Sequence, residues 1–355
     1  MKRKILCGII LSALFCSVNV NADDQVNQAI DVSARAANWK PSLRYPDPAV
    51  EVLDPSFLKY RLFGASVEQL ATGFRWIEGP AWNSQKGYLV FSDIPNNRLM
   101  KWDEKTSKTS IFKNASNNSN GNIYDLQGRL ITAEHLGRRV IRTEANGKIT
   151  VLADHYQGKR LNSPNDLAIQ ADGSVWFTDP PFGISNYYEG VKAKSELGYD
   201  GVYRIDAKTG KLHLVLNDLH GPNGLVFSPD GKYIYIIEGR AQPDRLIWRY
   251  DVQNDGSLTN KTKFFDATNN GALDGIKMDE DGNIWAGWGS TGALGVDPAP
   301  LDGVIVINPE GKVIGHIHTP ERCPNITFGG PNKNRLFMAC SHSVYSIYVN
   351  TRGAY

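Results

Sequence analysis

Short apolar runs separated by polar turns recur along most of the chain, and six pairs of runs share one plan. In each copy a polar residue precedes an apolar run, a turn follows seven or eight residues later, and a second run rich in aromatic residues comes next. Runs of this length, bounded by Gly, Asn, Asp and Pro, predict antiparallel β-strands joined by tight turns. The polar residues that open the six copies are Glu78, Asn120, Asn165, Asn223, Asp274 and Asn325.

The spacing of these six aligned residues predicts a β-propeller. They lie 42, 45, 58, 51 and 51 residues apart, which are the lengths of four-stranded blades. The last copy has only one further strand-like run before the chain ends, so a run near Ser66 is expected to supply the missing outer strand and close the ring. A β-sandwich also has many short strands, but it does not predict six matched copies. We therefore expect an all-β fold, a six-bladed propeller with four-stranded blades over residues 66–355.

The first 22 residues have the pattern of a secretory signal peptide. A basic start is followed by an apolar run over residues 5–18 and by small residues before Asp23. The run is short for a bilayer span, so an uncleaved anchor is the weaker alternative. We expect cleavage near Asp23, a periplasmic or secreted product that does not remain on a membrane, and an extended arm over residues 23–65.

The charge balance excludes one class of partner. Lys and Arg number 39 and Asp and Glu 37. Residues 1–22 hold three of the basic residues and none of the acidic ones, so the remaining chain is close to neutral. Near-neutrality gives no electrostatic reason to expect nucleic acid or an anionic membrane as a partner.

Two cysteines remain after the expected cleavage, Cys323 and Cys340. Both fall in the sixth copy, where the repeat places them close together, and the compartment is oxidising. A disulfide between them is therefore expected, with two buried free thiols as the alternative. Two cysteines are too few for a Cys-based zinc site.

The aligned residues are expected to form a ring at one mouth of the central channel, because the innermost strands surround the axis and begin at the same end. Four of them, Glu78, Asn165, Asn223 and Asp274, would bring two carboxylates and two amide oxygens together. Two carboxylates in a narrow channel repel each other unless a cation lies between them. Oxygen donors predict one divalent ion, with Ca²⁺ or Mg²⁺ ahead of Zn²⁺. The alternative is turn chemistry, which favours Asn and Asp, although Glu78 is a poor turn residue.

A second polar layer lies at the ends of the second strands, at Asp93, Glu134, Asp179 and Glu238. Strand ends are commonly polar, so most of these residues are expected to be solvated or bonded to loops. Glu134, Asp179 and the adjacent His135 are candidate substrate contacts. A structural histidine is an equally good interpretation of His135, because one histidine alone carries little specificity.

No nucleophile elbow, His-Glu-x-x-His motif or phosphate-binding glycine loop occurs in the sequence. Reactivity is therefore expected at the metal, where an ion polarises a carbonyl oxygen and a carboxylate accepts a proton. A polar insertion over residues 184–200 interrupts the third copy. Insertions of this length are either lids and binding loops or passive surface segments.

Five stretches of the chain carry a resemblance to a known family. They are FRWIEGPAW from residue 74, SDIPNNRLMKWD from 92, RLNSPNDLAIQADGSVWFTDPPFG from 160, HGPNGLVFSPDG from 220 and LDGIKMDEDGNIW from 273. Together they resemble the SMP-30/gluconolactonase/luciferin-regenerating family, most closely its exported bacterial gluconolactonases. The similarity runs from about Tyr45 to the C-terminus.

The resemblance implies a six-bladed propeller with a divalent ion on its axis and hydrolysis of a small sugar lactone, typically glucono-1,5-lactone to gluconate. It implies metal ligation by Glu78 in EGP, Asn223 in PNG and Asp274 in LDG, and metal or substrate binding by Asn165 in PND. It also implies that Asp274 is the proton acceptor. Hydrolysis of another lactone or a phosphotriester, and a non-enzymatic propeller that binds carbohydrate or peptide, are the alternatives. The pair of carboxylates argues against the non-enzymatic alternative.

Overall fold

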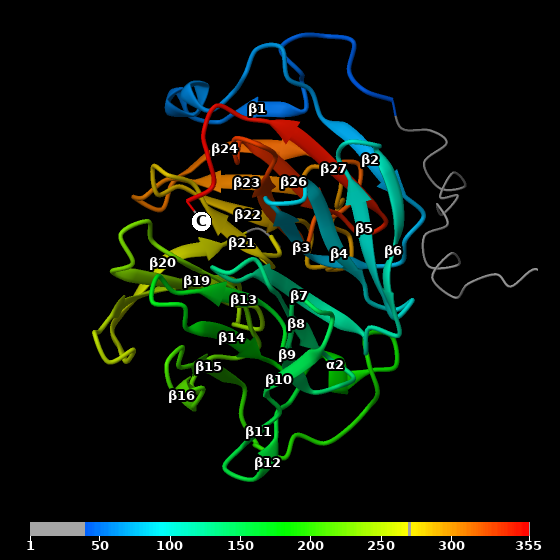
Figure 1. Cartoon of the computed structure of the whole chain (residues 1–355). Coiled ribbons are helices and arrows are strands. Elements are labelled where there is room, and N and C mark those ends of the chain that lie inside the picture. The colour runs from blue at the N-terminus through cyan, green and yellow to red at the C-terminus, as the bar shows by residue number, and fades with distance from the viewer. Residues whose placement is uncertain (1–39, 269–270, 355) are drawn as a thin grey trace, which may run out of the picture.

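Six antiparallel sheets surround a central axis in the computed structural model, which describes residues 40–268 and 271–354 (Figure 1). In five of the sheets, four strands follow one another in chain order from the axis outward. The only helical elements among the described residues are the 3₁₀-helix η1 (Pro55–Lys59) and the short helix α2 (Phe182–Ser185). The predicted all-β, six-bladed propeller is confirmed.

The first three blades contain twelve strands. These are β3 (Ile77–Asn83), β4 (Tyr88–Asp93), β5 (Arg98–Asp103), β6 (Lys108–Asn114), β7 (Ser119–Tyr124), β8 (Leu130–Glu134), β9 (Arg139–Thr143), β10 (Ile149–Ala153), β13 (Leu167–Ile169), β14 (Val175–Asp179), β15 (Gly201–Ile205) and β16 (Leu212–Leu216). Two short strands, β11 (His155–Tyr156) and β12 (Lys159–Arg160), form a hairpin between the second and third blades.

The last three blades complete the ring. Their strands are β17 (Pro222–Phe227), β18 (Tyr233–Glu238), β19 (Arg245–Val252), β20 (Leu258–Ala267), β21 (Ile276–Met278), β22 (Ile284–Trp288), β23 (Gly303–Ile307), β24 (Val313–His318), β25 (Asn325–Gly329), β26 (Arg335–Ala339) and β27 (Ser343–Tyr348). The outer strand of the sixth blade is β2 (Glu68–Thr72), which pairs antiparallel with β27 so that Glu68 faces Ser346. The predicted closure by an N-terminal strand is confirmed.

The segment before β2 lies against the fifth and sixth blades. Its strand β1 (Val50–Val52) pairs with β24 and makes the fifth blade five-stranded. Phe57 of η1 is buried, with its ring 6.2 Å from that of Trp285. The predicted signal peptide over residues 1–22 lies outside the described residues. No helix in the described part of the chain has the length and apolar character needed to cross a bilayer.

Apolar side chains fill the space between neighbouring blades. Trp82 stacks on Phe337 between the first and sixth blades, with ring centroids 5.2 Å apart. Trp176 meets Phe227 edge to face at 5.5 Å between the third and fourth. Each inner strand also contacts the inner strand of the next blade, from β3 round to β25 and back to β3. The first residues of the six inner strands therefore have fixed positions relative to one another.

Candidate active site

A small cavity lies on the axis at the end where the inner strands begin. Its volume is about 260 Å³, and five of the six aligned residues line it: Glu78, Asn120, Asn165, Asn223 and Asp274. The sixth, Asn325, lies directly behind them and donates a hydrogen bond from Nδ2 to Oε2 of Glu78 at 2.9 Å. The structure thus brings together the four residues that the sequence predicts to share an ion.

A glycine follows four of the aligned residues because the next blade passes so close. A Cβ atom on Gly79 would lie 2.0 Å from the carbonyl oxygen of Asn120, and one on Gly224 would lie 2.5 Å from that of Asp274. The amide of Gly224 donates to the same Asp274 oxygen at 3.0 Å. Asn223-Gly224 lies within a strand and Asp274-Gly275 directly before one, so the alternative of turn chemistry is wrong.

The aligned residues coincide with irregular pairing in three blades. The register between the first and second strands shifts between Glu78 and Ala81 in the first blade. Equivalent shifts follow Ser119 in the second blade and Pro222 in the fourth. A β-bulge bends its strand and re-aims the local side chains, which allows a residue at the start of an inner strand to point into the axial cavity.

The carboxylates at the ends of the second strands hold the loops that enter the inner strands. In three blades such a carboxylate accepts the backbone N–H of the residue three positions before the aligned residue. The pairs are Arg75 N to Asp93 Oδ1 at 3.1 Å, Asn162 N to Asp179 Oδ2 at 2.8 Å and His220 N to Glu238 Oε1 at 2.8 Å. These carboxylates therefore position the cavity residues from behind.

Glu134 has the same kind of role in the second blade. Its Oε2 accepts from Arg139 Nε at 2.6 Å and from the side-chain amide of Asn117 at 3.0 Å. Neither Glu134 nor Asp179 is among the residues that line the cavity. Substrate contact is the sequence-based expectation for both. Their placement and their partners give them a structural task instead, so we do not assign substrate binding to them.

Replacing Asp179 with Asn is expected to stabilise the protein, and to do so more strongly above pH 7 than at pH 5. Burial raises the pKa of Asp179 to about 7, and its Oδ1 is buried without a hydrogen-bond partner among the described residues. Because this pKa exceeds the value of about 3.9 in an unfolded chain, the folded state binds more protons between these pH values. The free energy of unfolding therefore falls as pH rises from about 4 to 7.

An Asn at this position still accepts from Asn162 N and carries no charge to bury. Thermal unfolding of both proteins at pH 5 and pH 8 measures the effect, with a gain of about 5 °C expected at pH 8. A difference in melting temperature that is the same at both pH values would contradict this prediction.

His135 links the second blade to the insertion over residues 184–200. It is fully buried, and burial lowers its pKa to about 4, so the imidazole is neutral at pH 7. Its Nδ1 lies 3.2 Å from the backbone oxygen of Glu189 and its Nε2 lies 3.2 Å from Nδ2 of Asn120. With the proton on Nδ1, the ring donates to Glu189 and accepts from Asn120. His135 is therefore placed behind Asn120 and outside the cavity lining.

The insertion supplies part of the cavity wall and is not a passive surface segment. Asn186 and Glu189 line the cavity beside Phe182 of α2. Burial, and next the negative charge of Asp274, raise the pKa of Glu189 to about 7. Glu189 could not be identified as a site residue from the sequence, because no repeat aligns with this insertion.

Glu78 and Asp274 form an electrostatically strained pair. Burial raises the pKa of both carboxyls, and the charge of Asp274 is the next largest cause of the rise at Glu78. Arg322 and Arg245 oppose the rise at Asp274. Nη2 of Arg322 donates to Asp274 Oδ2 at 2.9 Å, and Nδ2 of Asn223 donates to Oδ1 at 2.7 Å.

Four further charged residues belong to this site and are missing from the sequence prediction. Asp166 is buried behind Asn165, and its charge raises the pKa of both Glu78 and Asp274. The other three, Arg240, Arg245 and Arg322, line the cavity. Arg240 lies on a loop and Arg245 begins β19, the third strand of the fourth blade, where the repeat has no fixed pattern. Arg322 alone stands at a repeated position, three residues before Asn325.

The predicted disulfide between Cys323 and Cys340 is wrong. Both cysteines are free and buried. The register pairs Asn325 with Ala339, so the two cysteines are offset by one residue from facing positions. The two thiols lie near each other and interact without forming a bond between the sulfur atoms. The sulfur atoms also lie 3.6 Å from Ala339 O for Cys323 and 3.9 Å from Met338 O for Cys340. Burial raises the pKa of both thiols, which makes them poor nucleophiles.

The fold and the cavity together define a six-bladed propeller with paired carboxylates on its axis. Residues 76–342 match the family model described as the SMP-30/Gluconolactonase/LRE-like region. The protein belongs to this family, as the resemblance in its sequence implies.

Several relatives of known name are similar to the chain. A gluconolactonase from Zymomonas mobilis is 32% identical over 81% of this chain and 82% of its own. The solved structure of a gluconolactonase from Xanthomonas campestris is 32% identical, covers 84% of this chain and 94% of its own, and superposes with a TM-score of 0.76. A diisopropyl-fluorophosphatase from Loligo vulgaris is 24% identical over 60% of this chain and 72% of its own.

Proposed function

We propose that this protein hydrolyses sugar lactones with the help of one divalent metal ion, and that glucono-1,5-lactone is a substrate. The observation that carries the proposal is the pair of buried carboxylates, Glu78 and Asp274, in one axial cavity with the amides of Asn165 and Asn223. The gluconolactonases from Zymomonas mobilis and Xanthomonas campestris support the choice of substrate.

The donor set of the cavity fits a divalent ion. Glu78 and Asp274 carry the two negative charges that would balance the charge of the ion. Their raised pKa values mean that their ionised forms are unfavourable when no cation lies beside them. The side-chain amide of Asn165 lines the cavity and offers an oxygen to the ion. Asn223 uses its Nδ2 on Asp274, which leaves its amide oxygen for the ion. Oxygen ligands favour Ca²⁺ or Mg²⁺ over Zn²⁺.

When bound, the ion would polarise the lactone carbonyl and help to hold the attacking water. Asp274 would take the proton of that water at a carboxylate oxygen while the water oxygen bonds to the carbonyl carbon. The bond from that carbon to the ring oxygen then breaks, and the ring oxygen takes up a proton and leaves as a hydroxyl group. Burial raises the pKa of Asp274, and the positive charges of Arg322 and Arg245 oppose that rise, which favours the ionised form that a base requires.

The remaining lining suits a polar ring of hydroxyl groups. Arg240, Asn186 and Glu189 offer hydrogen-bond donors and acceptors, and Trp76 and Phe182 supply apolar faces. The guanidinium of Arg240 lies 4.7 Å from the Phe182 ring centroid, which fixes its position. We propose that these residues orient the sugar, so that Asp274 meets the carbonyl side of the ring.

A pH-stat assay tests the proposed activity. The protein should release acid from glucono-1,5-lactone at a rate well above that of spontaneous hydrolysis, and the same molar amount of the Asp274→Asn protein should not. Binding of the lactone in a calorimeter without any release of acid would contradict hydrolysis and would indicate a binding propeller.

Hydrolysis of a phosphotriester is the second candidate function. It is favoured by the similarity to the diisopropyl-fluorophosphatase from Loligo vulgaris. Fluoride release from diisopropyl fluorophosphate, measured beside acid release from the lactone, separates the two. We expect the ratio of kcat/KM values to favour the lactone, since the more similar relatives are gluconolactonases.

We also propose that the protein is exported to the periplasm or secreted after cleavage near Asp23, and then acts away from the membrane. The supporting observation is the pattern of residues 1–22. N-terminal sequencing of the protein from the soluble exported fraction of a bacterial host tests this, and a start at Met1 would contradict it.

A further inference from the structure

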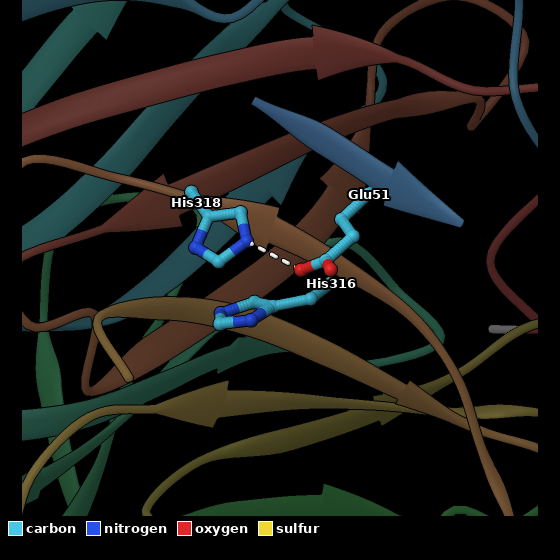
Figure 2. A group of neighbouring side chains, drawn as sticks. All are labelled: Glu51, His316 and His318. Atoms are coloured by element: carbon cyan, nitrogen blue, oxygen red, sulfur yellow. Dashed lines mark hydrogen bonds and ion pairs between the residues drawn. The ribbon is translucent and has the colours of Figure 1, made fainter. Parts of the chain in front are cut away.

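A second group of metal-ligating side chains lies far from the axial cavity in the fold, on the outer side of the fifth blade. His316 and His318 occupy alternate positions of β24 and so share one face of the sheet. The neighbouring strand β1 places Glu51 directly opposite His316 in the antiparallel register. Figure 2 shows the three side chains converging from these two strands.

The three side chains are close enough to hold one ion. Nε2 of His318 lies 2.8 Å from Oε2 of Glu51, and the two imidazole centroids are 3.8 Å apart. One ring nitrogen of each histidine and one carboxylate oxygen all lie within 4.8 Å of one another. Ligand atoms bound to Zn²⁺ at about 2.0–2.2 Å in tetrahedral geometry are roughly 3.5 Å apart. Small rotations of the side chains therefore suffice to close the site.

His316 has an unused ligand atom. The residue is buried, at 6% exposure, and its Nε2 has no hydrogen-bond partner among the described residues. Buried polar atoms are rarely left unpaired in proteins.

We propose that Glu51, His316 and His318 bind a divalent ion of the Zn²⁺ class, separate from the ion of the axial cavity. Two imidazoles and one carboxylate suit Zn²⁺ and similar transition metals, whereas Ca²⁺ and Mg²⁺ prefer oxygen ligands. Three protein ligands leave a fourth position for water, which the exposed side of Glu51 and His318 allows.

The ion would fasten the N-terminal segment to the propeller. β1 pairs only with β24, at the edge of the fifth blade, and the two strands are about 260 residues apart in the chain. A cross-link that closes so long a loop removes conformational freedom mainly from the unfolded chain, and metal binding to the folded state adds directly to stability. The expected role of this ion is structural.

Zinc titration of untagged protein tests this site. The protein is first stripped with a chelator and then given excess Ca²⁺ to occupy the axial cavity. Calorimetry should show one more equivalent of Zn²⁺ bound by the wild type than by His318→Gln or Glu51→Gln. Both variants change exposed or half-exposed side chains and are expected to fold. His213→Gln, on the outer strand β16 of another blade, is the matched control and should bind Zn²⁺ as the wild type does.

Thermal unfolding provides a second measurement that does not depend on enzyme activity. Zn²⁺ at about 100 times its dissociation constant should raise the melting temperature of the wild type and of His213→Gln by several degrees. The melting temperatures of His318→Gln and Glu51→Gln should not change when Zn²⁺ is added. Equal zinc stoichiometry and equal shifts in the wild type and in His318→Gln would overturn the proposal, as would the absence of zinc binding by the wild type.

Discussion

Asp274→Asn should lower kcat for lactone hydrolysis by about 10³-fold with little change in melting temperature, because a general base contributes roughly 10²–10⁴ to the rate. The amide has a single acceptor oxygen, so it keeps only one of the two hydrogen bonds that Asn223 and Arg322 donate to Asp274 at 2.7 and 2.9 Å. The loss of the other bond is offset because the substitution removes one of two neighbouring buried charges. The amide cannot take a proton from water at neutral pH. Initial rates in a pH-stat, together with the melting curve, measure both effects.

Asp230→Asn is a suitable control for this substitution. Asp230 lies in the turn between β17 and β18, at the opposite end of the blade from the cavity, and accepts from Ser228 Oγ at 2.7 Å. An Asn there can accept the same bond. Its activity should equal that of the wild type. A near-wild-type kcat in Asp274→Asn with metal bound would show that Asp274 is not the base.

Removal of the divalent ion should abolish lactone hydrolysis almost completely. Without it, two buried carboxylates share one cavity, and each favours protonation of the other. Dialysis against a chelator should therefore reduce the rate to that of the uncatalysed reaction, and added Ca²⁺, Mg²⁺ or Zn²⁺ should restore it. An unchanged rate in protein shown by elemental analysis to hold less than about 0.05 ion per chain would rule out a metal mechanism.

Glu78→Gln separates metal binding from proton transfer. Loss of one of the two charged ligands should raise the metal concentration needed for half-maximal rate by about 100-fold, an estimate that rests on the charge dependence of calcium sites. At saturating metal, kcat should recover much further than it does in Asp274→Asn. Glu310→Gln, in an exposed turn of the fifth blade, should leave the metal dependence unchanged.

The repeated polar position was the part of the site that the sequence could predict. Glu78, Asn165, Asn223 and Asp274 precede apolar runs at blade spacing, and the topology requires such residues to meet on the axis. Glycine follows Glu78, Asn223 and Asp274. Asn-Gly and Asp-Gly are turn dipeptides, which is why turn chemistry remained the alternative interpretation. The cause of these glycines is the close passage of the next blade, a contact between segments about 50 residues apart that no local pattern reveals.

The remaining site residues depend on loops and on burial. Glu189 reaches the cavity only because the insertion folds back over His135. Arg240 and Arg245 come from positions where the repeat has no fixed pattern. Cys323 and Cys340 also show what the repeat pattern can and cannot predict. The repeat spacing correctly predicts that the two thiols lie near each other. It does not determine whether they are joined, and in the structure both are free.

In three blades, the residue that holds the loop behind the cavity is separate from the residue that points into the cavity. Asp93, Asp179 and Glu238 accept hydrogen bonds from main-chain N–H groups. These bonds do not depend on the side chain that follows three residues later. A substitution at an aligned position thus alters the chemistry on the axis without disturbing the scaffold that presents it. Such modularity would let descendants of one ancestral ring exchange ligands singly and so drift toward new substrates.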